Sequence, residues 1–277
     1  MILPPAGGVH TVMRPVVLSI AGSDNSCGAG AQADLKTITS LGGYAQTAIT
    51  CVVAEAPGKV RAIQAVKPQI VAEQIRLSFE AFPVAAIKTG MLYSAPIIRA
   101  VSAEFDRHRK LPPLVVDPVM VASSGDPLLK RSAISAYKNL LFPIASLVTP
   151  NLDELRILSG IPCRNLEEMK AAGRVLAAEF GVPFLLKGGH LKSRMAVDVL
   201  ATANDLIEFQ SPFVLGADTH GTGCTFSSAI ATGLAHGLPL ADAVGQAKAF
   251  ITEAIQTRLR WKKTSALNHG GSAVCKP

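Results

Sequence analysis

Short runs of aliphatic residues recur along the chain, and longer segments with the period of an α-helix separate them. The runs are nearly continuous rather than alternating with polar residues, a pattern typical of strands that are covered on both faces. We expect strands over Val16–Ile20, Thr47–Val53, Val84–Ile87, Leu114–Val116, Ser146–Thr149 and Phe184–Leu186. We expect helices over Ala29–Leu41, Gln69–Phe82, Pro96–Arg109, Asn165–Phe180 and Ala241–Arg260.

The order of these elements predicts an α/β fold with a mostly parallel central sheet and helices on both sides. A hairpin is expected where Met195–Ala201 and Leu206–Gln210 flank a short polar turn. No linker, charge block or fixed-period repeat divides the sequence. We therefore predict a single domain over residues 15–262, an N-terminal extension over 1–14 and a C-terminal tail over 263–277.

The composition is that of an ordinary globular protein. Hydrophobic residues make up 49% of the 277 residues and charged residues 17%, which is too apolar for a disordered chain. The net charge of +7 is compatible with nucleic acid, an acidic lipid or a phosphorylated small substrate. The basic residues gather only at Arg107–Lys110 and Arg258–Lys263, and a single aromatic residue, Trp261, accompanies them. This pattern argues against nucleic-acid binding.

Two long segments, Thr37–Ala54 and Thr219–Ala241, carry no charged side chain. Both are rich in Thr, Ser and Gly, so we interpret them as buried elements of a soluble fold rather than membrane spans. The first 13 residues have no Lys or Arg and are broken by prolines and glycines, so we expect no signal peptide. The five cysteines form no CxxC pair, which argues against a disulfide framework or a zinc site and indicates a reducing, cytoplasmic location.

Polar motifs follow the expected strands, at the edge where open parallel sheets bind ligands. A glycine-rich loop over 21–30 follows the first strand; it is either a tight turn or a place where backbone approaches a ligand. Gly28 and Gly30 are followed by Asp34 rather than by the third glycine of a dinucleotide fingerprint, so a dehydrogenase is disfavoured. Asp117 ends another strand, where a carboxylate among apolar residues needs a partner.

Asn151 and Glu154 follow the next strand and allow two interpretations. Their spacing fits a capping box at the start of a helix, which alone would explain both residues. Residues at i and i+3 also share a helix face, where an amide and a carboxylate could hold waters around Mg²⁺.

The strongest motif is the turn at 220–224. Gly221 and Gly223 on either side of Thr222 let successive amides point at one spot, and the helix that follows adds positive potential. We therefore expect a phosphate-binding nest. Cys224 lies in the first helical turn, where the pKa of a thiol tends to fall; alternatively it is a small buried residue at a helix start. We interpret His220 as a polar loop residue.

In order along the chain, these motifs are AGSDNSCGAGAQADLKT (21–37), KTGML (88–92), VVDPVM (115–120), SGDPLL (124–129), TPNLDE (149–154), LLKGGH (185–190) and THGTGC (219–224). From about Val16 to Trp261 the chain resembles the hydroxymethylpyrimidine and phosphomethylpyrimidine kinases of thiamine biosynthesis, a branch of the ribokinase-like superfamily. The resemblance implies a three-layer αβα sandwich, a homodimer, and two successive phosphorylations of a pyrimidine alcohol by ATP and Mg²⁺.

The resemblance also assigns expected roles to individual residues. Positions of the pyrimidine pocket are matched by Gly22, Asp34, Glu55, Met91, Val119 and Cys224. The Mg²⁺ and phosphate-side cluster is matched by Asp117, Asn151 and Glu154. The ATP site is matched by Thr149, Lys187, Gly221, Thr222 and Gly223. Cys224 takes the place of the Asp base of the sugar kinases, and we expect it, with Lys187, to be catalytic.

Two residues depart from the family pattern. Glu55 stands where the family usually has a Gln that contacts the pyrimidine, and Cys27 replaces a common Gly. A carboxylate can accept two hydrogen bonds from a protonated aminopyrimidine, so we expect Glu55 to bind that form of the ring. Two alternatives stay open: a pyridoxal or pyridoxine kinase of the same superfamily, and a non-catalytic ligand-binding protein with this fold.

Overall fold

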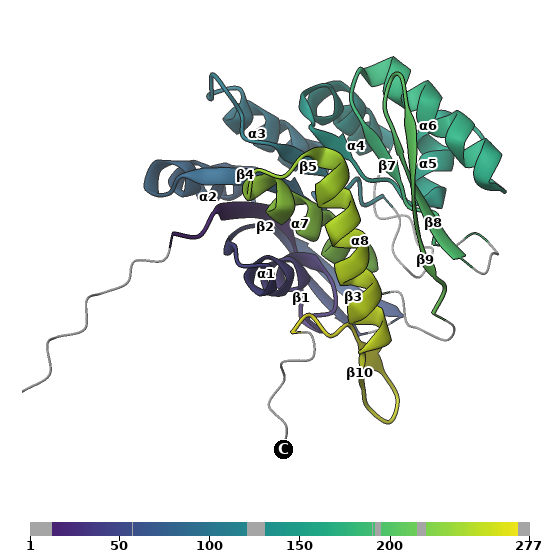
Figure 1. Ribbon diagram of the computed structural model, residues 1–277. Helices are drawn as coiled ribbons and strands as arrows, with labels where there is room; N and C mark the ends of the chain where they lie inside the picture. Colours follow the sequence, from purple (N-terminus) through teal and green to yellow (C-terminus); the bar gives the residue numbers. More distant parts are fainter. Residues whose placement is uncertain are drawn as a thin grey trace, which may run out of the picture.

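The computed structural model describes residues 13–56, 58–120, 131–189, 191, 195–214 and 220–270 (Figure 1). Its centre is a nine-stranded sheet in the order β3-β2-β1-β4-β5-β6-β7-β8-β9. The strands from β2 to β7 in this order run parallel; β3 is antiparallel to β2, β8 to β7 and β9 to β8. Their bounds are β1 Val16–Asp24, β2 Tyr44–Ala56, β3 Lys59–Ala65, β4 Val84–Thr89, β5 Leu114–Val116, β6 Leu147–Val148, β7 Phe184–Leu186, β8 Met195–Ala201 and β9 Leu206–Pro212.

Helices cover both faces of this sheet, so the prediction of an α/β sandwich is confirmed (Figure 1). One face packs on α2 (Pro68–Ala81), α3 (Ala95–Phe105), α4 (Arg131–Ala136), α5 (Leu152–Ser159) and α6 (Leu166–Phe180). The other face packs on α1 (Gly30–Ser40), α7 (Thr222–Ala235) and α8 (Leu240–Gln256).

The continuous apolar runs reflect this double coverage. Successive side chains of a strand point to opposite faces, so Leu18 and Ile20 lie in one core while Val17 lies in the other. In β5, Leu114 and Val116 belong to the first core and Val115 to the second. Because neither face meets water, no polar alternation is needed.

The predicted elements are mostly confirmed, with several differences. Helix α4 was not predicted, and α3 ends at Phe105 rather than at residue 109. The edge strand β3 was not predicted, because its side chains are largely exposed and its sequence has no apolar run. The last helix ends at Gln256 rather than at residue 260, and a small hairpin of β10 (Leu259–Arg260) and β11 (Ser265–Ala266) follows it. The packed chain therefore extends beyond the predicted boundary at 262, as the burial of Leu267 and His269 shows.

The two uncharged segments differ in burial. In α7, residues 225–233 are all buried, as predicted. In β2, Tyr44 and Val52 are about half exposed, so the first segment is only partly buried. Among the described residues, none of the helices combines the length and the hydropathy that crossing a bilayer would require.

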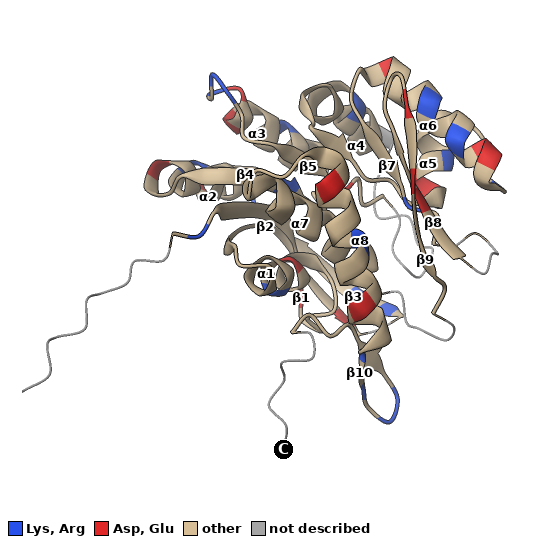
Figure 2. Ribbon diagram, in the orientation of Figure 1, with Lys and Arg blue, Asp and Glu red and all other residues tan. Residues whose placement is uncertain are grey.

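The two basic clusters lie at opposite ends of the molecule (Figure 2). One follows α3, and the other occupies the β10–β11 hairpin beyond the end of α8. Within the described part of the chain, these clusters do not join into one basic surface. The parallel strands β1, β4, β5, β6 and β7 all end at the same edge of the sheet, which brings the predicted motifs together.

Candidate active site

A cavity of about 490 Å³ opens at this edge of the sheet. It is bounded by the loop after β1, the end of β2, the loops after β4 to β7 and the start of α7. Twelve of the predicted site residues line it: Gly22, Glu55, Met91, Asp117, Val119, Asn151, Glu154, Lys187, Gly221, Thr222, Gly223 and Cys224. The predicted phosphate nest and the predicted ring site thus share one cavity.

The nest forms as the start of α7. Gly221 is the N-cap residue and has a φ of 77°, in the left-handed region that favours glycine. A Cβ atom there would lie 1.8 Å from the carbonyl oxygen of Gly28, so only glycine fits. A Cβ atom at Gly223 would lie 3.1 Å from Nζ of Lys187. Glycine at 221 therefore lets the turn pack against Gly28, and glycine at 223 keeps the space beside the Lys187 ammonium free, which suits an anionic group.

The cation beside the nest is anchored. Nζ of Lys187 donates to Oδ1 of Asp117 over 2.7 Å. The same carboxylate accepts hydrogen bonds from the hydroxyls of Thr149 and Ser227, each over 3.2 Å. Burial favours a neutral amine, but the carboxylates of Asp117 and Glu154 outweigh it and hold the pKa of Lys187 above its ordinary value. The ammonium therefore stays charged and points at the nest.

Asn151 and Glu154 form the capping box that the spacing predicted. Oδ1 of Asn151 accepts from the backbone N–H of Asp153 and of Glu154, and Oε2 of Glu154 accepts from the N–H of Asn151. The other oxygen of Glu154 accepts from the N–H of Met120. These bonds fix the carboxylate at the cavity wall, close to Lys187 and Asp117.

Two buried carboxylates beside a single lysine make a site that suits a divalent cation. Burial raises the pKa of the Glu154 carboxyl to about 7; Lys187 opposes this rise and Asp117 adds to it. Asp117 and Glu154 are each 2% exposed, and both line the cavity. Carboxylate oxygens with room for water and phosphate oxygens are the ligands that Mg²⁺ prefers. The residues present therefore fit Mg²⁺.

Cys224 lies partly exposed on the wall between the nest and the rest of the cavity. Burial of its thiol raises its pKa to about 11, and the neighbouring Lys88 opposes this rise only in part. The prediction that the helix start lowers this pKa is wrong, because desolvation outweighs the helix dipole here. The thiol is neutral at pH 7.

Another part of the cavity wall includes Gly22, Glu55, Met91 and Val119. A Cβ atom at Gly22 would lie 2.8 Å from Sγ of Cys51 and 3.7 Å from Sδ of Met91, so only glycine fits against Cys51 here. Met91 and Val119 are half-buried on the wall. Glu55 adds a half-buried carboxylate, and Asp24 also lines the cavity. The combination suits a small ring that carries hydrogen-bond donors.

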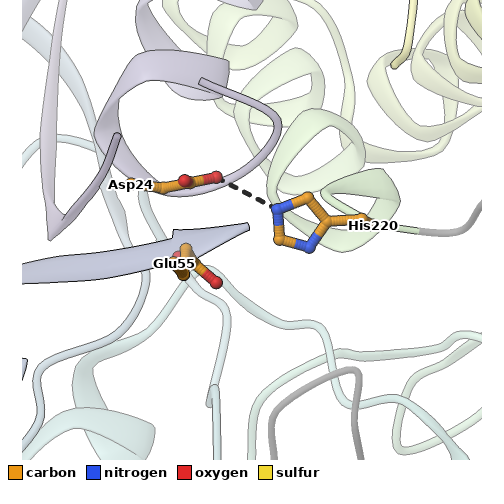
Figure 3. A group of neighbouring side chains, drawn as sticks. All are labelled: Asp24, Glu55 and His220. Atoms are coloured by element: carbon orange, nitrogen blue, oxygen red, sulfur yellow. Dashed lines mark hydrogen bonds and ion pairs between the residues drawn. The ribbon is translucent and has the colours of Figure 1, made fainter. Parts of the chain in front are cut away.

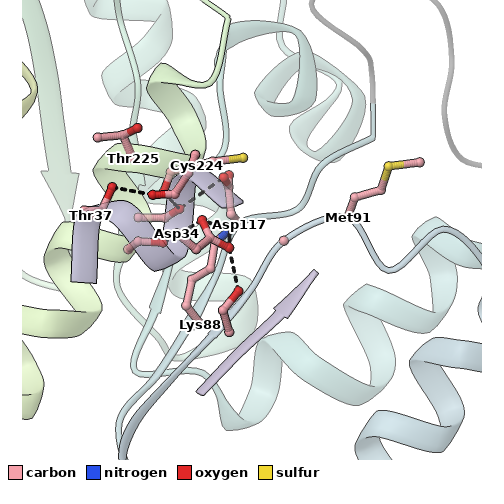
Figure 4. Close-up of polar contacts among 12 residues, drawn as sticks. Asp34, Thr37, Lys88, Met91, Asp117, Cys224 and Thr225 are labelled. Carbon is pink, nitrogen blue, oxygen red and sulfur yellow. Dashed lines mark hydrogen bonds and ion pairs between the residues drawn. The ribbon is translucent and has the colours of Figure 1, made fainter. Parts of the chain in front are cut away.

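Asp34 and Thr149 do not line the cavity. Asp34 is fully buried in α1, where its carboxylate accepts from Ser19, Lys88 and Ser228 (Figure 4). Thr149 is fully buried at the end of β6 and contacts Asp117. In this structure both residues lie behind the cavity wall, and the roles expected of Asp34 at the ring and of Thr149 at the nucleotide stay predictions.

The family model described as phosphomethylpyrimidine kinase matches residues 24–269. The chain belongs to the phosphomethylpyrimidine kinase family. The hydroxymethylpyrimidine/phosphomethylpyrimidine kinase of Mycobacterium leprae is 42% identical over 258 residues, which cover 91% of this chain and 91% of that protein. The thiamine biosynthesis bifunctional protein ThiED of Geobacter sulfurreducens is 46% identical over 243 residues; they cover 88% of this chain and 49% of that protein, so the chain spans about half its length.

Solved structures of family members and of pyridoxal kinases share the fold. The phosphomethylpyrimidine kinase of Clostridium difficile 630 has a TM-score of 0.77 at 38% identity, covering 87% of this chain and 100% of that one. The pyridoxal kinase of Bacillus subtilis, in complex with ADP, has a TM-score of 0.86 at 32% identity, covering 94% and 98%. The ribokinase-like sandwich is therefore confirmed. Backbone similarity extends to both kinds of kinase, whereas sequence identity is higher with the phosphomethylpyrimidine kinases.

The sequence interpretation did not assign Asp24 and His220 to the site, although both line the cavity. Asp24 ends β1, and its carboxylate lies 3.0 Å from Nε2 of His220, for which the sequence predicts only a polar loop residue (Figure 3). The motif at 124–129, together with His190 and Thr219, lies outside the described residues.

Proposed function

We propose that this member of the phosphomethylpyrimidine kinase family phosphorylates 4-amino-5-hydroxymethyl-2-methylpyrimidine with ATP, and then its monophosphate to the pyrophosphate, in thiamine biosynthesis. One observation carries the proposal: the nest at Gly221–Gly223, with Lys187 beside it, lines the same cavity as Gly22 and Glu55. A phosphoryl group can pass between two ligands only if their sites adjoin.

Lys187 and the nest amides hold the transferring phosphates of ATP in this account. Phosphoryl transfer needs positioning and neutralisation of charge more than covalent chemistry. The ammonium of Lys187 lies next to Gly223, so its charge and the amides act on the same anion. Asp117 fixes the direction of the ammonium through their 2.7 Å hydrogen bond. Thr149 acts behind this pair by binding Asp117.

Asp117 and Glu154 would hold Mg²⁺, with Asn151 keeping Glu154 in place through the capping box. When bound, the cation neutralises charge on the phosphates. Glu154 would hold this ion in its ionised form, and burial raises the pKa of its carboxyl to about 7. We expect calorimetric titration of Mg²⁺ in the presence of nucleotide to show binding that Asp117→Asn abolishes.

Cys224 faces the acceptor oxygen. An alcohol loses its proton during transfer, and a positioned base speeds such a step by roughly 10²–10⁴-fold. A phosphate monoester is already ionised, and a fixed carboxylate beside it would repel it. The thiol of Cys224 is neutral at pH 7 because burial raises its pKa to about 11, so it does not repel the monoester. Its minor thiolate form would accept the proton that the alcohol loses as the phosphoryl group transfers, and the thiol would then return that proton to water.

The experiment is a direct comparison of acceptors. ADP formation is measured with the aminopyrimidine alcohol, its monophosphate, pyridoxine, pyridoxal and no acceptor. The proposal predicts turnover with both pyrimidines at a kcat/KM at least tenfold above that with either pyridine. A pyridoxal kinase is the second candidate, because the TM-score with the Bacillus subtilis enzyme is 0.86; a preference for the pyridines would support it. No ADP with any acceptor would support a non-catalytic binding protein.

We propose that the enzyme works as a homodimer in the cytoplasm. The exposed, stacked rings of Tyr44 and Phe82, 5.7 Å apart, and the half-exposed Val52 supply apolar surface that a second copy could cover. Light scattering coupled to size exclusion tests the assembly: a mass near 58 kDa, twice the 28.9 kDa of the chain, is expected, and a mass of one chain would exclude it.

A further inference from the structure

Asp24 holds the glycine-rich loop after β1 in shape. One carboxylate oxygen accepts from the backbone N–H of Ser26 over 2.6 Å. The other accepts from the Ser26 hydroxyl over 2.9 Å and from the N–H of Ala29 over 2.8 Å, and it lies 3.0 Å from Nε2 of His220. These contacts use both oxygens, so the loop closes around Asp24.

His220 connects this loop to the phosphate nest. It directly precedes Gly221, the N-cap of α7. A Cβ atom at Gly28 would lie 2.6 Å from the His220 ring, and one at Gly221 would lie 1.8 Å from the oxygen of Gly28. The two loops therefore interlock at van der Waals distance, and the position of one constrains the position of the other.

Glu55 faces the same pair from β2. One ionisable atom from each of Asp24, Glu55 and His220 lies within 4.8 Å of the others (Figure 3). Burial raises the pKa of Glu55, the carboxylate of Asp24 adds to this rise and His220 opposes it. Burial acts in the same sense on Asp24, but the bonds from His220, Ala29 and Ser26 hold its pKa at about 2. The imidazole thus lies close to two carboxylates that repel each other and that both attract it.

We propose that Asp24 and His220 form a lock between the two loops, through which a ring bound at Glu55 strengthens nucleotide binding at the nest. His220 is a positioning residue in this inference, which rests on the proposed kinase function. With the ring site empty, Glu55 competes with Asp24 for His220. Donors of a bound ring neutralise Glu55, so His220 is left to Asp24 and the nest is held in place.

The test measures the affinity for a non-hydrolysable ATP analogue by calorimetry, with and without the pyrimidine alcohol. For the unmodified protein we expect the ring to tighten nucleotide binding at least about fivefold, the lower end of common coupling between sites. His220→Phe keeps a ring against Gly28 but cannot bond Asp24, so the coupling falls to about onefold and the affinity without the alcohol stays low. His220→Gln can still donate to Asp24 and retains coupling.

Glu55→Gln gives the opposite signature. It removes the competing charge, so nucleotide binds the protein without the alcohol as tightly as it binds the unmodified protein with the alcohol, and coupling again disappears. His236→Asn is the matched control: this histidine bonds the carbonyl of Leu41, outside the cavity lining, and its loss leaves coupling unchanged.

The lock is overturned if His220→Phe retains full coupling. It is also overturned if the Phe and Gln variants lose affinity for the ATP analogue equally. Thermal unfolding checks that each variant folds. If His220→Phe does not fold, Glu55→Gln decides the question. A low affinity of that variant for the ATP analogue without the alcohol would refute the competition of Glu55 with Asp24 for His220. Turnover of the pyrimidines by the unmodified protein separates the two proposals, because an active enzyme without coupling disproves only the lock.

Discussion

The ammonium of Lys88 and the carboxylate of Asp34 form an ion pair with no exposed surface (Figure 4). Nζ of Lys88 contacts both oxygens of Asp34, at 2.9 and 2.8 Å, and Ser19 and Ser228 donate to the same carboxylate. The pair joins β4 to α1, and Ser228 extends it to α7 one turn after Cys224. It therefore fixes the helix that carries the nest against the sheet.

Lys88→Met would leave the Asp34 carboxylate buried without its counter-ion. We expect a loss of about 3–5 kcal/mol in the free energy of unfolding, because an unpaired buried charge is costly. Adding Asp34→Asn removes the second charge and should recover most of that loss. Urea denaturation measures both. The exposed pair of Arg164 and Glu168 supplies the control, since Arg164→Met should cost less than about 1 kcal/mol. A double variant as unstable as Lys88→Met would show that the charge is not the cause.

Protonation of His269 should make the free energy of unfolding depend on pH. Its ring is 5% exposed, and Nε2 lies 2.9 Å from the hydroxyl of Thr225, next to Cys224. Burial lowers its pKa from 6.5 to about 4, with the charge of Lys36 adding to the effect. The unfolded chain therefore binds this proton more readily, so the stability that neutral His269 supplies is complete above pH 6.5 and is lost as the pH falls towards 4.

Thermal unfolding from pH 7.5 to 4 tests this expectation. The unmodified protein should lose more stability across that range than His269→Gln, which has no ring to protonate. Parallel curves for the two proteins would mean that other groups cause the acid sensitivity.

Glu55 should make binding of the aminopyrimidine depend on pH. Affinity falls as the pH rises and the ring loses its proton, because the charge-assisted pair with the carboxylate is lost. Affinity also falls at low pH, where Glu55 itself takes up a proton; burial raises the pKa of Glu55, so this decline begins above the pH at which an exposed glutamate titrates. Calorimetric titration of the alcohol at several pH values measures both limbs. Glu55→Gln should flatten the profile, and an unchanged profile would refute the pairing.

Local sequence patterns predicted the parts of the site that local geometry creates. The glycines at 221 and 223 and the capping box of Asn151 and Glu154 depend on residues within one helical turn, so spacing alone indicates them. The lock between Asp24 and His220 joins residues 196 positions apart, and no local pattern carries such a contact. The direction of the Cys224 pKa shift depends on how deeply the fold buries the thiol, so the sequence argument from the helix start gave the wrong sign.

The ion pair of Asp34 and Lys88 could not be predicted either, because it joins residues that are far apart in the sequence. The sequence indicates that Asp34 lies in the first turns of a helix beside the glycine-rich loop. Only the packing of α1 against β4 and α7 turns its carboxylate away from the cavity and towards Lys88. The fold was easier to predict, because continuous apolar runs and helical periodicity are repeated at every strand and helix of the sandwich.

Separate rates for the two acceptors in Cys224→Ala test the central claim most directly, since the thiolate form of Cys224 is proposed to take the proton of the alcohol, whereas the monoester needs no base. Single-turnover phosphorylation of the alcohol should slow by about 10²–10⁴-fold, whereas phosphorylation of the monophosphate should change by less than about threefold, a barrier difference near 0.65 kcal/mol. Equal slowing of both steps would contradict the account.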